Sequence, residues 1–144
     1  MLFLGEYRVN LTEGGRVVIP KKIREVLGKT KSFTLTKGFD RCLSGFRNED
    51  WEKSALELMG VSVLEMKKVE IKRHLFSSAA ILEIDEQGRV IIPKNLLSYV
   101  GLEKDKEAIF IGVGTYFEIW NQERWERYKK EVEMGIKNYQ EKEF

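Results

Sequence analysis

The chain has 144 residues, and its 25 basic residues nearly balance its 23 acidic ones, for a net charge of +2. That length suits one ordinary domain or two small units that share a core, and 42% hydrophobic residues suffice for a globular fold. No apolar run approaches the ~20 residues of a membrane span, and no basic segment of the signal-peptide kind opens the sequence, so we expect a cytoplasmic protein without membrane partners.

One heptapeptide motif occurs twice. Gly15–Lys21 reads GRVVIPK and Gly88–Lys94 reads GRVIIPK, at an offset of 73 residues, and both prolines of the chain lie in these motifs. The similarity continues on both sides, and from Gly38 and Gly112 onward the offset is 74, as one inserted loop residue would produce. A unit repeated in this way indicates two copies of one supersecondary structure packed against each other.

In chain order, the first copy begins with two strands joined by a glycine turn. Apolar and polar residues alternate over 7–11, which is the pattern of a half-buried strand. Gly14 and Gly15 follow as a turn. The uninterrupted apolar run 17–19 then predicts a strand that is covered on both faces.

A short helix and a hairpin come next. Pro20 suits the start of a helix, and Gly28 suits its C-terminal cap. Residues 33–36 and 41–43 predict the two strands of the hairpin. Cys42, the single cysteine, excludes an internal disulfide and is expected to be a small apolar strand residue in a reducing compartment.

Helices follow each hairpin. Asn48 predicts the N-cap of the first of them, and residues 62–77 predict a connecting helix with a basic face. The second copy repeats the order with Pro93, Gly101 and Asn121 in equivalent places. Each copy thus reads β-β-α-β-β-α. We predict an α+β, β-rich fold in which two units form a pseudo-dimeric β core flanked by helices, with a first unit, a helical connector, a second unit and a C-terminal helix at 5–47, 48–77, 78–121 and 122–144.

Motifs of catalysis or cofactor binding are missing from the sequence. The one histidine, His74, lies in the connector without a nucleophile elbow, and no H-E-x-x-H, paired C-x-x-C or Walker-type loop occurs. Gly112–Gly114 is half of a dinucleotide fingerprint, but its place between two short strands favours a hairpin turn. We therefore expect no enzyme activity, no metal and no cofactor.

Basic residues gather on the first copy. Residues 8–37 carry eight basic and two acidic side chains, whereas residues 81–110 carry four and six. The asymmetry suggests that the first copy faces a polyanion. Two ordinary solvated faces are the alternative explanation of the same composition.

An arginine follows the glycine of each turn. Gly15 and Gly88 permit a positive φ, and Arg16 and Arg89 then begin a rigid strand. A guanidinium held in this way pairs bidentately with phosphate or with the guanine edge. Asp85 is placed to accept amide hydrogens of its turn and to hold Arg89. DNA contact is favoured for Arg16, while for Arg89 a salt bridge over the turn is an equal alternative.

These residues carry a family resemblance. The pattern Asp-x-x-Gly-Arg, an apolar triplet, proline and a short helix ending in glycine resembles the swapped-hairpin domain of the AbrB/SpoVT superfamily. Two such units, the opening Phe3–Tyr7 and a tryptophan-bearing helix after each copy resemble the MraZ family over nearly the whole chain. The resemblance implies a DNA-binding transcriptional regulator of the bacterial division and cell-wall gene cluster, associated with the nucleoid and assembled into rings.

Two departures from the family pattern bear on DNA contact. Thr12 and Gly14 stand where the first copy usually has aspartate and lysine, and the missing lysine removes one phosphate contact. In the related AbrB pattern a basic residue of the helix after the proline also contacts DNA. Arg24 matches that position, whereas its counterpart Leu97 does not.

We therefore expect a sequence-specific regulator that binds double-stranded promoter DNA at tandem repeats as a ring-like homo-oligomer. The expected DNA contacts are basic residues of both copies, chiefly of the first, namely Arg16, Lys21, Lys22, Arg24, Arg8, Arg89 and Lys94. The alternative is a non-catalytic protein-interaction module, such as an antitoxin-like partner or a scaffold, whose basic face is incidental.

Overall fold

The computed structural model describes residues 1–103 and 106–143. The first copy contains β1 (Glu6–Asn10), a 3-10 turn (Glu13–Gly15), β2 (Arg16–Val18), α1 (Lys21–Leu27), β3 (Ser32–Lys37), β4 (Leu43–Phe46) and α2 (Asn48–Met59). Helix α3 (Met66–Ser78) leads to the second copy, which contains β5 (Ala80–Glu83), β6 (Arg89–Ile91), α4 (Lys94–Val100), β7 (Glu107–Gly112), β8 (Phe117–Asn121) and α5 (Gln122–Glu143). Both copies follow the predicted order β-β-α-β-β-α.

The larger sheet has six antiparallel strands in the order β1-β7-β8-β4-β3-β5. Strand β1 of the first copy pairs with β7 of the second, and β5 of the second copy pairs with β3 of the first. Each copy therefore gives its first strand to the other. Exchanging the two copies leaves the strand order unchanged, so a pseudo-twofold axis passes between β4 and β8. This confirms the predicted duplicated, swapped and pseudo-dimeric β core.

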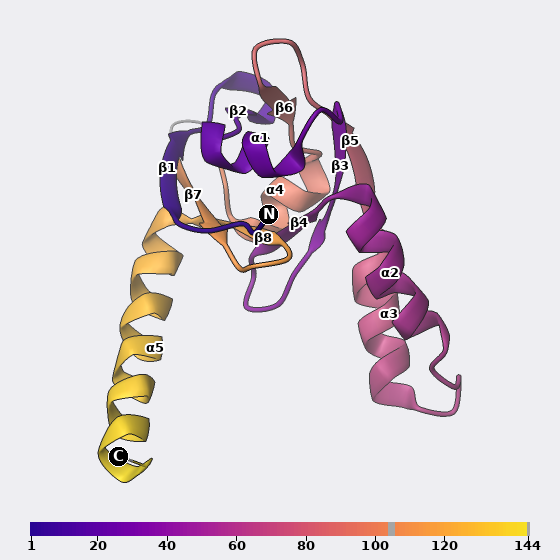
Figure 1. Cartoon of the computed structure of the whole chain (residues 1–144), viewed down its shortest axis with the longest axis vertical. Helices are drawn as coiled ribbons and strands as arrows, with labels where there is room; N and C mark the ends of the chain where they lie inside the picture. The colour runs from indigo at the N-terminus through magenta and orange to yellow at the C-terminus, as the bar shows by residue number, and fades with distance from the viewer. Residues whose placement is uncertain (104–105, 144) are drawn as a thin grey trace.

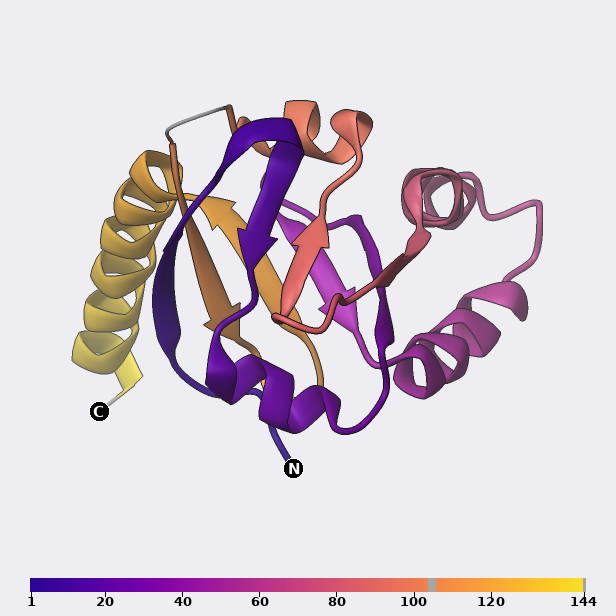
Figure 2. The ribbon, with the colours of Figure 1, turned by 90° about the horizontal axis from the view of Figure 1, so that it is seen from above.

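A ribbon of β2 and β6 lies over this sheet as a second layer. Figure 2 shows the two strands side by side in front of the sheet, with α1 and α4 at opposite ends. Val17 and Val90 point inward from the ribbon and join Phe33, Phe110 and Phe117 in one continuous core. Because that core draws on both copies, each copy supplies the layer that the other needs.

The ribbon strands are covered on one face only, so the prediction of a doubly covered strand over 17–19 is wrong. Val17 and Ile19 are buried, but Val18 is 48% exposed, and Ile91 in β6 is 54% exposed. Successive side chains of a strand point to opposite faces. Val18 therefore faces outward in spite of its apolar neighbours.

Proline and glycine bracket the short helices as predicted. Pro20 and Pro93 directly precede α1 and α4 as their N-caps. Gly28 and Gly101 follow the two helices with φ values of 79° and 73°. Only glycine adopts this left-handed conformation without strain, which explains where both helices end.

The hairpin differs from its prediction, because β4 begins at Leu43 and residues 41–42 lie in the preceding loop. Asp40 and Arg41 have φ values of 58° and 61°, which a strand cannot accommodate. Cys42 is buried as expected, but it is a loop residue whose thiol contacts the Phe39 carbonyl and the Glu118 carboxylate. Burial raises the pKa of this thiol.

The two predicted asparagine caps have different outcomes. The Asn121 side chain accepts a hydrogen bond from the Arg124 amide at 3.1 Å, as an N-cap does. Asn48 is instead the first residue of α2, and its side-chain amide bonds to Thr34 at 2.8 Å and to Ser32 at 2.9 Å. The prediction for Asn48 is wrong because its side chain bonds to polar groups of β3 instead of capping the helix.

Helical arms extend from both sides of the β core (Figure 1). Helices α2 and α3 lie together on one side, and α5 lies on the other, and both arms point away from the ribbon. Helix α3 begins at Met66, later than the predicted start at residue 62. Within the described ranges, no helix combines the length and the apolar character needed to cross a membrane.

Candidate nucleic-acid interface

Four side chains form the outer surface of the ribbon, which we call the ribbon face: Arg16, Val18, Arg89 and Ile91. Strands β2 and β6 pair so that Arg16 lies opposite Ile91 and Val18 lies opposite Arg89. The central pair, Val17 and Val90, points into the core. Alternation along both strands therefore places two arginines diagonally on one exposed, two-fold symmetric surface.

The turns that precede these strands are bonded to the opposite copy. The Ile19 amide donates to the Gly88 carbonyl at 2.8 Å, and the Ile92 amide donates to the Gly15 carbonyl at 2.9 Å. Gly15 and Gly88 both have a φ of 77°. These cross-copy bonds hold the point from which each arginine starts, so the backbone of the ribbon face is rigid.

Arg89 is tied to its own turn. One oxygen of Asp85 accepts the Gln87 and Arg89 amides, each at 2.9 Å, and the other oxygen accepts the Arg89 Nε at 2.9 Å. Gln87 accepts a further bond from Arg89 Nη2 at 2.6 Å. The backbone hydrogen bond from Arg89 lowers the pKa of Asp85, and the neighbouring guanidinium acts in the same direction. Asp85 thus both caps the turn and holds the arginine, as predicted.

Arg16 has no such restraint. Thr12 replaces the aspartate, and its hydroxyl donates to the Arg16 carbonyl at 3.0 Å instead of accepting from the arginine. Within residues 1–103 and 106–143, the Arg16 guanidinium has no hydrogen-bond or ion-pair partner. Its five N–H donors are available to a ligand.

Lysines stand beyond both ends of the ribbon. Lys21 and Lys22 begin α1 and Lys94 begins α4, and all three side chains are exposed. Lys22 lies 3.9 Å from Glu25 in an exposed pair, which holds it weakly. Two of these lysines belong to the first copy and one to the second.

Arg8 is placed elsewhere. It lies in β1, at the edge of the six-stranded sheet, where its guanidinium is 3.7 Å from Glu107 and 3.3 Å from Glu126 of α5. The structure therefore does not bring Arg8 together with the ribbon face.

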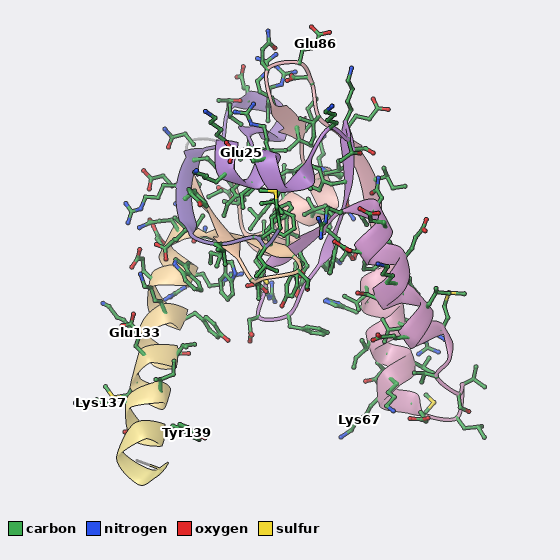
Figure 3. All side chains as sticks on the ribbon, viewed as in Figure 1. Glu25, Lys67, Glu86, Glu133, Lys137 and Tyr139 are labelled. Atoms are coloured by element: carbon green, nitrogen blue, oxygen red, sulfur yellow. The ribbon has the colours of Figure 1, made fainter. Side chains whose placement is uncertain are left out.

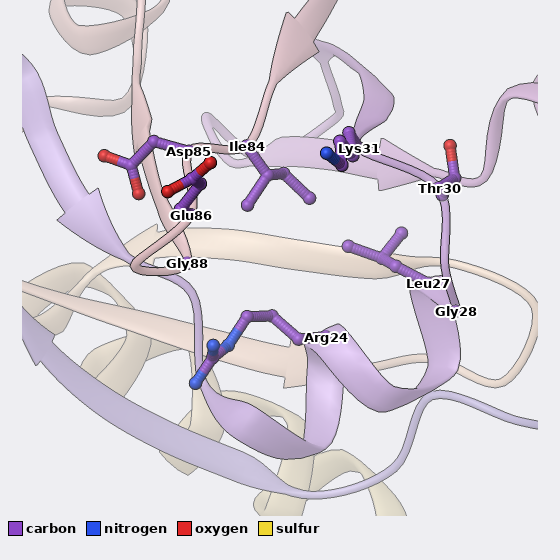
Figure 4. A pocket seen from close by; sticks show the side chains of 9 residues that line it. All are labelled: Arg24, Leu27, Gly28, Thr30, Lys31, Ile84, Asp85, Glu86 and Gly88. Atoms are coloured by element: carbon purple, nitrogen blue, oxygen red, sulfur yellow. The ribbon is translucent and has the colours of Figure 1, made fainter.

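Arg24 is half-buried and reaches from α1 to a position below Gly88, as Figure 4 shows. Its Nε donates to the Ile19 carbonyl at 3.0 Å. The side chain lines a hollow of about 320 Å³ together with Leu27, Lys31, Ile84 and Glu86. Glu86 itself stands at the tip of the β5–β6 turn (Figure 3). Arg16, Arg24 and Arg89 are all half-buried, but Arg24 is the one whose guanidinium lies against the turn of the other copy.

The apolar half of the ribbon face was missed by sequence reasoning. The apolar run 17–19 predicts a buried Val18, and Ile91 stands at the equivalent position of the second copy. Both residues directly follow a valine at the centre of a strand, and side chains alternate along a strand. That alternation is the signal that could have placed Val18 and Ile91 on the outer face.

The other residues considered for catalysis or cofactor binding have structural roles. His74 Nε2 lies 2.7 Å from the Gly38 carbonyl, and its ring stacks on Phe39 and meets the edge of Tyr99. Gly112–Gly114 forms the β7–β8 hairpin turn as predicted, closed by a bond from Val113 to Tyr116. No cluster of three or more metal-ligating side chains occurs in the described parts of the chain.

Comparison with known proteins identifies the family. The sequence model described as "MraZ protein, putative antitoxin-like" matches residues 2–73 and again residues 75–144. The chain belongs to the MraZ family. The two matches correspond to the two copies and confirm the family indicated by the repeated motif.

Individual MraZ relatives are similar over almost the whole chain. A protein of Acetivibrio thermocellus named "Transcriptional regulator MraZ" is 40% identical over 98% of this chain and 96% of its own length. One of Ligilactobacillus salivarius with the same name is 38% identical over 92% of this chain and 90% of its own. Both relatives are transcriptional regulators by name.

A solution structure of a Pyrococcus horikoshii protein covers 81% of this chain and 96% of its own, with 18% identity and a TM-score of 0.38. A similarity this low adds nothing to the comparison of folds.

Proposed function

We propose that this protein is a non-enzymatic transcriptional regulator that binds double-stranded promoter DNA with its ribbon face. The observation that carries the proposal is the Arg16 guanidinium, which has no partner among the residues that the structure describes and stands on a rigid two-stranded ribbon. The names of the MraZ relatives support a role in transcription.

The geometry suits a DNA groove. A two-stranded ribbon fits the major groove, where arginine pairs bidentately with guanine. Val18 and Ile91 supply apolar contacts of the kind that a thymine methyl group accepts. Lys21, Lys22 and Lys94 at the ribbon ends suit contacts to phosphates, which fix the register of the protein on the duplex. Arg89 joins the interface as an arginine already oriented by Asp85.

The proposal extends to a ring-like homo-oligomer that acts on tandem promoter repeats. Exposed apolar side chains support it, since they lie on both arms, away from the ribbon: Leu56, Met59, Val63 and Leu64 on the α2–α3 side, and Val132, Met134 and Ile136 on α5. Figure 3 shows Glu133, Lys137 and Tyr139 on the stretch of α5 that extends beyond the body. Joining arms would leave every ribbon face free, and linked sites raise the effective concentration of the next one.

In the cell such a regulator acts at the nucleoid, on the promoter of the division and cell-wall gene cluster that the family resemblance implies. The proposed mechanism is occupancy of promoter DNA and uses no cofactor.

Arg16→Ala tests the proposal most directly. Loss of a bidentate arginine contact should weaken promoter binding by ~1–3 kcal/mol, or roughly 5- to 150-fold. The measurement is a fluorescence-anisotropy titration of labelled promoter fragments over a series of salt concentrations. Each lost phosphate contact should reduce the slope of log K against log salt by about 0.9.

Arg127→Ala is the matched control, because Arg127 is exposed on α5 and its loss changes the net charge equally. It should bind as the wild type does. Equal binding by Arg16→Ala and the wild type would contradict the ribbon-face interface. Failure of the wild type to bind any promoter fragment at low salt would favour the protein-interaction module instead.

A further inference from the structure

The turn of the second copy rests directly on Arg24. A methyl group placed on Gly88 would lie 2.7 Å from Arg24 Cζ and 2.9 Å from Arg24 Cδ, closer than atoms can approach. The side chain therefore ends beneath the Gly88 backbone, as the labelled residues of Figure 4 show. This contact crosses from α1 of the first copy to the β5–β6 turn of the second.

The turn of the first copy rests on Leu97 in the same manner. A methyl group on Gly15 would lie 2.6 Å from Leu97 Cδ1 and 2.9 Å from the Ile92 carbonyl. Leu97 lies in α4 at the position equivalent to Arg24 in α1, since both stand four residues after the proline of the motif. The two copies thus use the same architecture with two different side chains, one charged and one apolar.

Hydrogen bonds also connect Arg24 to the backbone of the turn. Its Nε donates to the Ile19 carbonyl at 3.0 Å, and the Ile19 amide donates to the Gly88 carbonyl at 2.8 Å. Gly88 is buried between these groups, and Arg89 follows it directly. Arg24 therefore supports the backbone from which Arg89 extends.

We infer that Arg24 is a positioning residue, which supports the Gly88 turn and so sets the place of Arg89, and that it does not act by contacting DNA. Leu97, which has no charge, performs the equivalent task beneath Gly15. This assignment rests on the proposed function for its DNA readout and differs from the DNA contact that the AbrB resemblance implies for Arg24.

The two copies supply the test, because Arg24→Leu installs the side chain that the second copy already uses. We expect Arg24→Leu to bind promoter DNA within about twofold of the wild type, with an unchanged salt slope, and Arg24→Ala to bind roughly tenfold more weakly. If Arg24 contacts phosphate, both variants lose affinity and both salt slopes fall by about 0.9. That result would overturn the assignment, as would wild-type binding by Arg24→Ala.

Hydrogen exchange of the Ile19 amide, followed by NMR without DNA, provides a second readout. Arg24→Ala should speed this exchange about tenfold, Arg24→Leu should restore it, and the Ile92 amide should not change in either variant. Leu97→Ala should speed the exchange of Ile92 and leave Ile19 unchanged. Exchange of Ile19 that is insensitive to Arg24→Ala would overturn the positioning role. Because this readout needs no DNA, it still decides the role of Arg24 if the wild type binds no promoter and the proposed function fails.

Discussion

At the scale of single residues, one substitution distinguishes the two turns. Asp85 is an anionic acceptor that caps the second turn and holds Arg89. Thr12 at the equivalent position is a neutral donor to the Arg16 carbonyl. Equivalent arginines therefore start from equivalent backbones but differ in freedom, because within the described residues only Arg89 is bonded to a carboxylate.

Asp85→Asn should expose the contribution of that charge to folding. Because the folded pKa of Asp85 lies below its ordinary value of 3.8, the carboxylate stabilises the fold above that value. This contribution is lost as the pH falls through the folded pKa. The variant should unfold at lower urea than the wild type at pH 7, and the two midpoints should converge below pH 3.8. A gap between the midpoints that persists at acid pH would mean that the charge of Asp85 is not its cause.

At the scale of elements, the ribbon turns depend on glycine for two separable reasons. Gly14 and Gly15 have φ values of 75° and 77°, which disfavour any side chain equally. A methyl group on Gly14 would meet no described atom within 4 Å, whereas one on Gly15 would collide with Leu97 and the Ile92 carbonyl. Glycine is therefore required at position 15 for two reasons, the backbone conformation and the close packing against the opposite copy.

Gly15→Ala should consequently destabilise the protein more than Gly14→Ala. Backbone strain alone costs about 1 kcal/mol in either variant, and overpacking adds ~1–3 kcal/mol at Gly15 only. Urea unfolding of the two variants measures the difference, with Gly14→Ala as the control for strain. Equal free energies of unfolding would show that the Gly15 turn can move away from Leu97.

At the scale of the whole molecule, the ribbon face and the helical arms point in opposite directions (Figure 1). That arrangement separates the proposed DNA contact from the proposed self-association. Leu56 and Leu64, both on the α2–α3 side, are 65% and 86% exposed, and large apolar side chains clustered at an exposed site favour an interface.

Leu56→Glu should reduce the size of the assembly, because an interfacial carboxylate would be desolvated without a partner. Sedimentation velocity should show smaller species. Affinity for tandem promoter repeats should fall at least tenfold, while affinity for a single repeat should stay within about twofold. Leu2→Glu is the control, since Leu2 is 57% exposed and lies outside the arms. An unchanged sedimentation coefficient for Leu56→Glu would contradict assembly through this arm.

Much of the fold follows from local sequence signals, and each failure has an identifiable structural cause. Pro20 and Gly28 define α1 because each has a backbone restriction that operates without tertiary context. The sequence pattern predicts a strand over residues 41–43, but Asp40 and Arg41 are held in left-handed conformations that the pattern does not reveal. Asn48 was assigned as a cap from its residue type, and its side chain found partners on β3 instead.

The repeated Gly-Arg-apolar-apolar-Ile-Pro-Lys motif, read from sequence alone, determined the duplication, the order of elements and the family, because these depend on residue identity and spacing. Tertiary structure decided which apolar residue of each ribbon strand faces outward. It also separated the predicted arginines: Arg16 without a partner in the described part of the chain, Arg89 held by Asp85, Arg8 paired beside α5 and Arg24 beneath Gly88. The reason is physical: the freedom of a charged side chain depends on neighbours supplied by the other copy or by a distant helix, and spacing along one chain does not contain them.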